Sequence, residues 1–332
     1  MRKDITKKFL MREDRYAKKM LSKEIVSFIA RRKINIDVKQ IGYDAIEFRN
    51  VFSTQFTKLN IRNILESGYK IKEVLLKDGK IIEFDMVYCD KGTFTMGADD
   101  PKDKNPKKQV EIEKPFLLGE TEVTQELYEF VMKKNPSLYR EDKYPNSSQR
   151  PMDNVTWYDA IMFCNKLSEL LGKNPYYEIK NVVPSSNSYY SKLNSIEMAN
   201  IGVNPQSNGF RLPLSKEWEN AARAGTNNQY AGTSDENKLG EYAWYRDNSN
   251  WKTHPVKQKK PNEWGFYDMI GNVYEWCWDK NPNNENESQH MIRGGCYLSD
   301  AQCIQKIIFM KSGLENEDRF GVFGFRIARN FF

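Results

Sequence analysis

Residues 265–276 read GFYDMIGNVYEW. Gly271, like Gly294 and Gly295 beyond it, is expected to supply a positive φ or a close backbone approach, because glycine has no Cβ. Trp276 is expected to fill space between loops as a large buried ring. The segment therefore predicts irregular backbone held in place by buried aromatic side chains.

Blocks rich in glycine, tryptophan and arginine lie on both sides of this segment. They are GTFTMG at 92–97, ETEVTQ at 120–125, PMDNVTWYDA with FCNKLS at 151–168, GFRLP with EWE at 209–219, RGG at 293–295 and GFR at 324–326. The ordered series resembles the formylglycine-generating-enzyme (sulfatase-modifying-factor) family. That resemblance implies an α+β fold, a C-type-lectin-like domain rich in irregular loops.

Most of these shared positions have structural explanations. Four tryptophans are expected in the core: Trp157, Trp218, Trp264 and Trp276. Arg211 and Arg326 are expected to be buried forks that bind carboxylates and loop carbonyls, because a guanidinium presents its donors in a fixed plane. Most of the motif residues are therefore predicted to serve the fold and not chemistry.

The chain divides into an N-terminal helical or mixed extension, residues 1–85, and the C-type-lectin-like domain, residues 86–332. Apolar residues recur at three- and four-residue spacing over 5–32, which predicts an amphipathic helix. That helix either packs on protein or lies on a membrane surface. Residues 34–85 predict a mixture of strand and helix, and we find no chemistry there.

Within the domain, three helices and two strands are predicted. The helices run over about 123–134 with Thr124 as its cap, over about 157–171, and onward from Ser215. The strands are 94–96 and 109–112, and polar loops are expected at 97–108, 139–150, 180–209 and 279–290.

Charge and composition exclude several classes of protein. The 332 residues carry a net charge of +6, but residues 1–40 alone hold 13 Lys and Arg against 5 Asp and Glu, so the rest is slightly acidic. The domain thus lacks the basic surface that nucleic-acid binding needs, and no nucleic-acid partner is expected. No stretch approaches 18 apolar residues, so no transmembrane segment is predicted.

The residues that catalysis would need are missing. Aligned on Gly294 and Gly295, the two copper-binding cysteines of the family fall on Ser299 and Ile304, which supply no thiolate for Cu(I). The chain has only two histidines, which excludes the three-histidine iron site of the family members that make ergothioneine. The sequence therefore predicts a protein that is not an enzyme.

One catalytic alternative stays open. Cys296 and Cys303 lie near the family's cysteine positions, although they are seven residues apart where the family pair is five apart. They could hold copper in a divergent oxidase or sulfatase-maturation-type enzyme. The calcium-dependent sugar motifs of C-type lectins are absent, so sugar binding by that route is not expected.

No cofactor is required, but a structural calcium is a hypothesis from the resemblance. Its ligands would be side-chain oxygens of Asp268 and Glu275 with the carbonyls of Gly271 and Val273. An oxygen-only set suits calcium. Alternatively, the two carboxylates bind loop amides and arginines.

Residues 296–323 depart most from the family pattern, although the motifs at both ends are intact. This arrangement resembles the variable proteins of diversity-generating retroelements, whose C-terminal segment is mutated at template adenines. Asparagine codons altered in this way give the residue types at the expected ligand-binding positions: Cys296, Leu298, Ser299, Asp300, Cys303, Phe320, Val322 and Phe323. Gln302, Lys306, Met310 and Lys311 are not reachable by that route.

Phe320, Val322 and Phe323 are expected on an exposed ligand face, whereas Ile307 is expected in a buried strand. The sequence thus predicts a non-catalytic, receptor-type protein that binds an unknown protein or cell-surface ligand through residues 296–323. The resemblance implies display at the cell surface, often as a lipoprotein, through a leader not present in this chain. A cytoplasmic structural homologue without a variable ligand is the remaining alternative.

Overall fold

The computed structural model describes residues 36–40, 45–50, 56–60, 66–77, 79–97, 106–140, 143–186, 195–280, 289–304 and 320–331. The amphipathic helix predicted over 5–32 lies outside these residues. Residues 36–60 contribute an antiparallel sheet of β1 (Ile36–Gln40), β2 (Ala45–Asn50) and β3 (Phe56–Asn60). The sequence predicts a mixture of strand and helix over 34–85. All the secondary structure that is described in this range is strand.

The central sheet of the domain is antiparallel, with the strand order β11-β15-β8-β5-β4. Its strands are β4 (Lys70–Lys77), β5 (Lys80–Cys89), β8 (Phe116–Gly119), β11 (Phe210–Arg211) and β15 (Ala328–Asn330). Residues 80–85 of β5 pair with β4, residues 86 and 87 pair with both β4 and β8, and residues 88 and 89 pair with β8. The continuous strand β5 therefore crosses the domain boundary predicted at 85/86.

Three smaller sheets surround the central one. They are β6 (Gly92–Met96) with β7 (Lys108–Ile112), β9 (Tyr177–Pro184) with β10 (Ile196–Val203), and β12 (Tyr274–Lys280) between β13 (His290–Arg293) and β14 (Phe323–Gly324). The first pair confirms the two predicted strands. The second contradicts the loop predicted at 180–209. Only Tyr177 and Ile196 of that hairpin are buried, so its strands lie mostly in solvent and leave apolar side chains such as Val182 and Met198 exposed.

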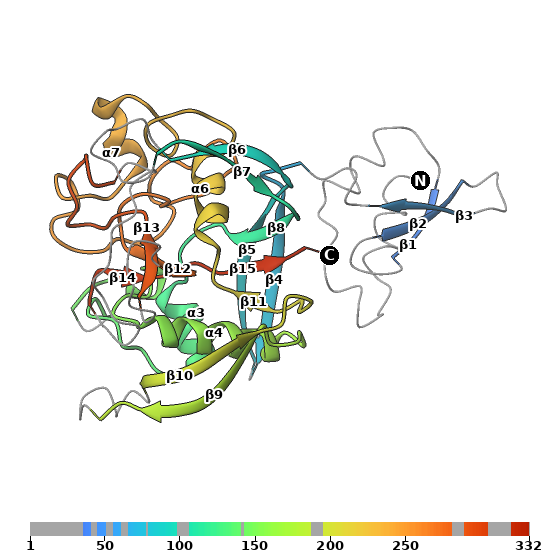
Figure 1. The fold of residues 1–332 in the computed structure, drawn as a ribbon, viewed down its shortest axis with the longest axis horizontal. Coiled ribbons are helices and arrows are strands. Elements are labelled where there is room, and N and C mark those ends of the chain that lie inside the picture. The colour runs from blue at the N-terminus through green and yellow to red at the C-terminus, as the bar shows by residue number, and fades with distance from the viewer. Residues whose placement is uncertain are drawn as a thin grey trace.

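The three predicted helices are confirmed as α3 (Gln125–Met132), α4 (Trp157–Leu170) and α6 (Ser215–Arg223). Shorter helices are α7 (Leu239–Tyr242), η2 (Ser147–Gln149) and η3 (Glu236–Lys238). Thr124 caps α3 as predicted, since its Oγ1 accepts the Leu127 amide at 3.3 Å. Figure 1 shows α3 and α4 side by side, and α6 near the β6–β7 pair and β13.

Buried aromatic rings hold these elements together in two clusters. Trp157 and Trp276 lie in the cluster with α3 and α4, and Trp218 lies in the cluster with α6, as predicted. Trp264 is only partly buried. Arg211 forms the predicted fork, with both terminal nitrogens 2.7 Å from the Glu217 carboxylate. Among the residues described, no helix is long and apolar enough to cross a membrane.

Arg326 is the second predicted fork, and it is fully buried. Its Nε and Nη2 donate to the Glu275 carboxylate at 2.6 and 2.7 Å. The same guanidinium donates to the carbonyls of Gly119 at 3.0 Å and Tyr267 at 3.1 Å. The Trp218 indole N–H also donates to Glu275, at 2.7 Å. One ion pair therefore ties the C-terminal strand region to β8, α6, β12 and the loop before β12.

We expect Arg326→Met to lower the free energy of unfolding by about 3 to 5 kcal/mol, because it leaves the Glu275 carboxylate buried without its cation. Urea unfolding of the full chain measures this. The control is Arg246→Met, which removes an exposed ion pair with Asp300 at 3.7 Å and should cost less than about 1 kcal/mol. Equal losses in the two variants would contradict the role given to Arg326.

Candidate functional site

The C-terminal segment 296–323 lies between two buried arginines. Before it, Arg293 at the end of β13 pairs with Glu219 at 3.1 Å and donates from Nε to the Ser215 hydroxyl at 2.9 Å. After it, Arg326 is held by Glu275. Both ends of the segment are therefore fixed to the core.

Two glycines turn the chain from β13 into the segment. Gly294 and Gly295 have φ values of +91° and +74°, as the sequence predicts. A Cβ at Gly295 would lie 2.4 Å from Cγ2 of Ile304, which is fully buried. Gly271 likewise has φ +80° and lies against the backbone of Trp244. Each of the three predicted glycine positions is confirmed.

Part of the predicted ligand face is buried. The Ser299 hydroxyl accepts the Cys296 amide at 3.0 Å and shares a hydrogen bond with the Tyr274 hydroxyl at 3.0 Å. Phe323 pairs with Tyr274 between β14 and β12, and its ring lies 5.4 Å from that of Trp276. The expectation that Phe323 is exposed is wrong, because the strand pairing turns its side chain into the core.

The other predicted positions reach the surface. Leu298 is 38% and Phe320 is 49% exposed, whereas Asp300, Cys303 and Val322 are half-buried. Asp300 fixes the turn after Leu298, since its Oδ1 accepts the Cys303 amide at 2.9 Å. The structure thus brings the predicted residues together in two layers. Residues 305–319, including Lys306, Ile307, Met310 and Lys311, lie outside the described residues.

Residues that the sequence did not single out surround this face. The Tyr139 hydroxyl lies 3.3 Å from the Trp251 carbonyl and shares a hydrogen bond of 2.7 Å with the Tyr297 hydroxyl. Leu138, next to it, touches Gly321. Leu138 and Trp251 are 55% and 69% exposed. The only sequence signal was an isolated tryptophan after the polar run Asp247-Asn248-Ser249-Asn250.

A buried carboxylate positions the loop that carries Leu138 and Tyr139. Asp153 accepts hydrogen bonds from the Ser137 hydroxyl and, at 2.9 Å, from the Leu138 amide. The Ser137 hydroxyl in turn accepts the Tyr139 amide at 3.0 Å. Burial raises the pKa of Asp153 to about 7, despite these hydrogen bonds. The loop is therefore attached to a group that titrates near neutral pH.

Of the two carboxylates suggested for calcium, Glu275 is committed to other partners, whereas Oδ1 of Asp268 is buried without a hydrogen-bond partner. Both oxygens of Glu275 accept hydrogen bonds from Arg326 or Trp218. Asp268 accepts the Lys257 amide at 2.9 Å, and burial raises its pKa to about 6. Within the residues described, no group of three or more His, Cys, Asp or Glu side chains could hold a metal. Glu275 is not free to bind a calcium ion in this arrangement, because the Arg326 guanidinium takes up its oxygens.

Cys296 and Cys303 are both free thiols. Cys296 lies 3.5 Å from the Ser299 hydroxyl. Burial raises the pKa of the Cys296 thiol, and burial followed by the nearby Asp300 carboxylate raises that of Cys303. Both therefore stay protonated at neutral pH, whereas metal binding needs the thiolate.

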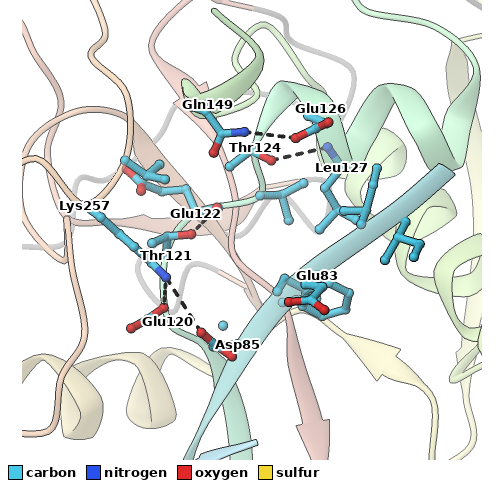
Figure 2. A pocket seen from close by; sticks show the side chains of 17 residues that line it. Glu83, Asp85, Glu120, Thr121, Glu122, Thr124, Glu126, Leu127, Gln149 and Lys257 are labelled. Carbon is cyan, nitrogen blue, oxygen red and sulfur yellow. Dashed lines mark hydrogen bonds and ion pairs between the residues drawn. The ribbon is translucent and has the colours of Figure 1, made fainter. Parts of the chain in front are cut away.

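A pocket with a cavity volume of about 230 Å³ lies elsewhere, between β5, the segment 119–124 and the start of α3. Figure 2 shows Lys257 pointing toward Glu120 and Asp85, both of which it contacts. Glu126 accepts a hydrogen bond from Gln149 at 2.9 Å and pairs with Lys80. The predicted ligand-binding residues do not line this pocket, and most of its carboxylates are paired.

We expect Asp153→Asn to change the pH dependence of stability. Because folding raises the pKa of Asp153 from about 3.9 to about 7, the wild type binds a proton on folding and loses stability as pH rises through this window. Relative to the variant, it should lose up to about 1.4 kcal/mol per pH unit between about pH 4 and pH 7. Urea unfolding at several pH values measures this, and parallel curves would contradict it.

Comparisons with known proteins agree with the motif analysis. Residues 73–331 match the model of the sulfatase-modifying factor enzyme 1-like domain. Chaperone protein LppX of Paenibacillus barcinonensis is 34% identical over 235 residues, which cover 65% of this chain and 79% of that protein. The formylglycine-generating enzyme of Streptomyces coelicolor is 30% identical over 148 residues, covering 37% of this chain and 47% of that one.

Among solved structures, Treponema denticola variable protein 1 superposes with a TM-score of 0.68 at 33% identity, covering 78% of this chain and 99% of that chain. CarF superposes with a TM-score of 0.57 at 26% identity, covering 75% and 99%. These relatives confirm the predicted α+β, C-type-lectin-like fold with its irregular loops. Since the family model covers most of its length, the chain belongs to the sulfatase-modifying factor enzyme 1-like domain family.

Proposed function

We propose that this protein is a non-catalytic, receptor-type binding protein that displays a diversified C-terminal surface on a C-type-lectin-like scaffold. The observation that carries the proposal is the arrangement of residues 296–323. Both ends of the segment are fixed by buried arginines, while Leu298 and Phe320 face solvent between them. A rigid frame that presents exposed apolar side chains is typical of a binding surface.

The likeness to Treponema denticola variable protein 1 supports this proposal, since it extends over nearly all of that chain. The ligand is a protein or other cell-surface molecule, and it contacts the outer residues of the segment: Leu298, Asp300, Cys303, Phe320 and Val322. The buried Cys296, Ser299 and Phe323 support this surface from below. Display at the cell surface, through a lipoprotein leader, completes the proposal.

The competing function is a copper-dependent oxidase that uses Cys296 and Cys303. The reason to consider this function is that the family includes formylglycine-generating enzymes. The raised pKa values of both thiols speak against it, because Cu(I) binds thiolates.

We expect an anaerobic Cu(I) titration at pH 7 to show no stoichiometric binding that depends on these two cysteines. The Cys296→Ser and Cys303→Ser variants should titrate like the wild type, with thiol quantification as the internal standard. Binding of one Cu(I) per chain that either substitution abolishes would establish the oxidase-type site.

We also expect the DNA beside the gene to carry a near-copy of the stretch that encodes 296–326, differing mainly where the copy has adenine, with a reverse transcriptase gene close by. Sequencing the gene from many cells of one culture should then find substitutions at those adenine positions. If neither a near-copy nor such substitutions were found, diversification would be refuted. The protein would then be a structural homologue without a variable ligand.

A further inference from the structure

The loop after α3, residues 134–139, is held against the ligand face by side chains. Within the described chain, residues 134–139 make no hydrogen bond between two backbone groups. Their backbone groups bind side chains of the neighbouring segments instead: those of Asp153, Asn154 and Gln125. A segment fastened in this way opens more easily than a helix or a strand, because few bonds must break. We call residues 134–139 the strap.

Asp153 is the central fastening of the strap, and its side chain is fully buried. Its Oδ1 accepts the Leu138 amide at 2.9 Å, and its Oδ2 is hydrogen-bonded to the Ser137 hydroxyl. That hydroxyl accepts the Tyr139 amide at 3.0 Å. A Cβ at Gly321 would lie 3.7 Å from Oδ1 of Asp153. The carboxyl group therefore lies beneath both the strap and the end of the C-terminal segment.

The strap supports the ligand face on two sides. The Tyr139 hydroxyl lies 3.3 Å from the Trp251 carbonyl and shares a hydrogen bond of 2.7 Å with the Tyr297 hydroxyl. Trp251 has a left-handed backbone, with φ +59°, which a bulky residue keeps only where its surroundings enforce it. Leu138 lies against Gly321, where an added Cβ would come within 2.5 Å of its Cδ1. An open strap would release all these contacts.

Three titratable side chains act electrostatically on Asp153: Arg150, Tyr139 and Tyr297. Burial raises the pKa of both tyrosines, so their hydroxyls stay neutral near pH 7. Arg150 keeps its positive charge, and the described residues show no ion pair between it and Asp153. Asp153 is therefore the group at this place that changes its charge near neutral pH.

Burial ties the protonation of Asp153 to the position of the strap. In the closed strap the pKa of Asp153 is about 7, whereas a hydrated aspartate has a pKa of about 3.9. The closed state therefore binds the proton more tightly than an open, hydrated state. Opening becomes easier by up to about tenfold for each unit of pH between about 4 and about 7, and changes little above that range.

We propose that the strap is a pH-dependent latch on the ligand face, closed while Asp153 holds its proton and opening when Asp153 loses it. Opening separates Tyr139 from Trp251, and Leu138 from Gly321. The face is then better ordered at acidic than at neutral pH, and it binds its ligand more tightly there. This inference rests on the proposed binding role of the C-terminal segment, and it supplies a regulation of that role.

Hydrogen exchange of the full chain, followed by NMR between pH 5 and pH 8, tests the latch. Corrected for intrinsic exchange, the protection of the Leu138 amide should fall by about tenfold or more up to pH 7 and then level off. Asp153→Asn should remove this fall, because its amide accepts from Leu138 and donates to Ser137 as a neutral acid does. The Ala160 amide, which donates to the Thr156 carbonyl at 3.2 Å in α4, reports global unfolding and should stay better protected.

A second measurement follows the ligand face itself. The chain has seven tryptophans, so 5-fluorotryptophan labelling is combined with Trp251→Phe to assign the fluorine signal of Trp251. His254 interacts electrostatically with Arg150, so these titrations use a His254→Gln background. The Trp251 signal should move over the same pH range as the Leu138 protection, and Asp153→Asn should hold it constant. Tyr139→Phe should keep the fall in protection but uncouple the Trp251 signal from it.

A Leu138 amide whose protection does not depend on pH, or equals that of Ala160 at every pH, would overturn the latch. So would a fall that persists in Asp153→Asn, or a Trp251 signal that stays constant with pH in the His254→Gln chain.

Circular dichroism establishes that each variant is folded. If Asp153→Asn does not fold, Ser137→Ala replaces it. Loss of the hydroxyl, whose hydrogen bond lowers the pKa of Asp153, should move the protection profile to higher pH, and an unmoved profile would contradict the latch. None of these measurements needs a ligand, and the template copy in the DNA tests diversification separately. Failure of the latch and failure of the proposed binding role are therefore distinguishable.

Discussion

The buried pair of Arg326 and Glu275 is the constraint on which the rest of the domain depends. A loop-rich fold has few long helices or strands to carry its backbone hydrogen bonds, so side chains must satisfy the carbonyls that loops leave in the interior. Arg326 does this for Gly119 and Tyr267 while its charge is balanced by Glu275. One residue thereby joins parts of the chain more than 200 positions apart.

The same pair occupies the Glu275 carboxylate that a calcium ion at the adjacent loop would need. A cation there would serve to neutralise Glu275 and to organise nearby carbonyls. Arg326 already does both. The nearby Glu122 is buried, and burial followed by the negative charges of Asp268 and Glu275 raises its pKa well above its usual range. The region therefore balances its charge with an arginine and with protons.

Motifs in the sequence were sufficient to predict the domain fold, its three main helices and its two arginine forks. These features depend on local signals, such as the Thr124 cap, and on residue types whose burial demands a partner. Features that depend on distant pairing were not predictable. The β9–β10 hairpin was predicted as a loop, and the extent of the central sheet depends on the pairing of β4 with β5 and of β5 with β8.

The candidate site shows the same division. Residues 296–323 stood out because their flanking motifs are intact, but the inward direction of Phe323 follows from its parallel pairing with β12. Leu138, Tyr139 and Trp251 are brought to the face by hydrogen bonds between segments far apart in the chain. No periodicity or motif in the sequence encodes those contacts, and neither does the left-handed backbone that turns Trp251 outward.

The two layers of the C-terminal segment have a consequence for any repertoire built on this scaffold. Cys296, Ser299 and Phe323 lie in the core, so most replacements there would create a cavity, a clash or a polar group without a partner. Variation at these sites would be filtered by folding before any ligand is met. The number of folded variants is then smaller than the number of sequences that the gene can encode. The diversity that remains is concentrated at the outer positions.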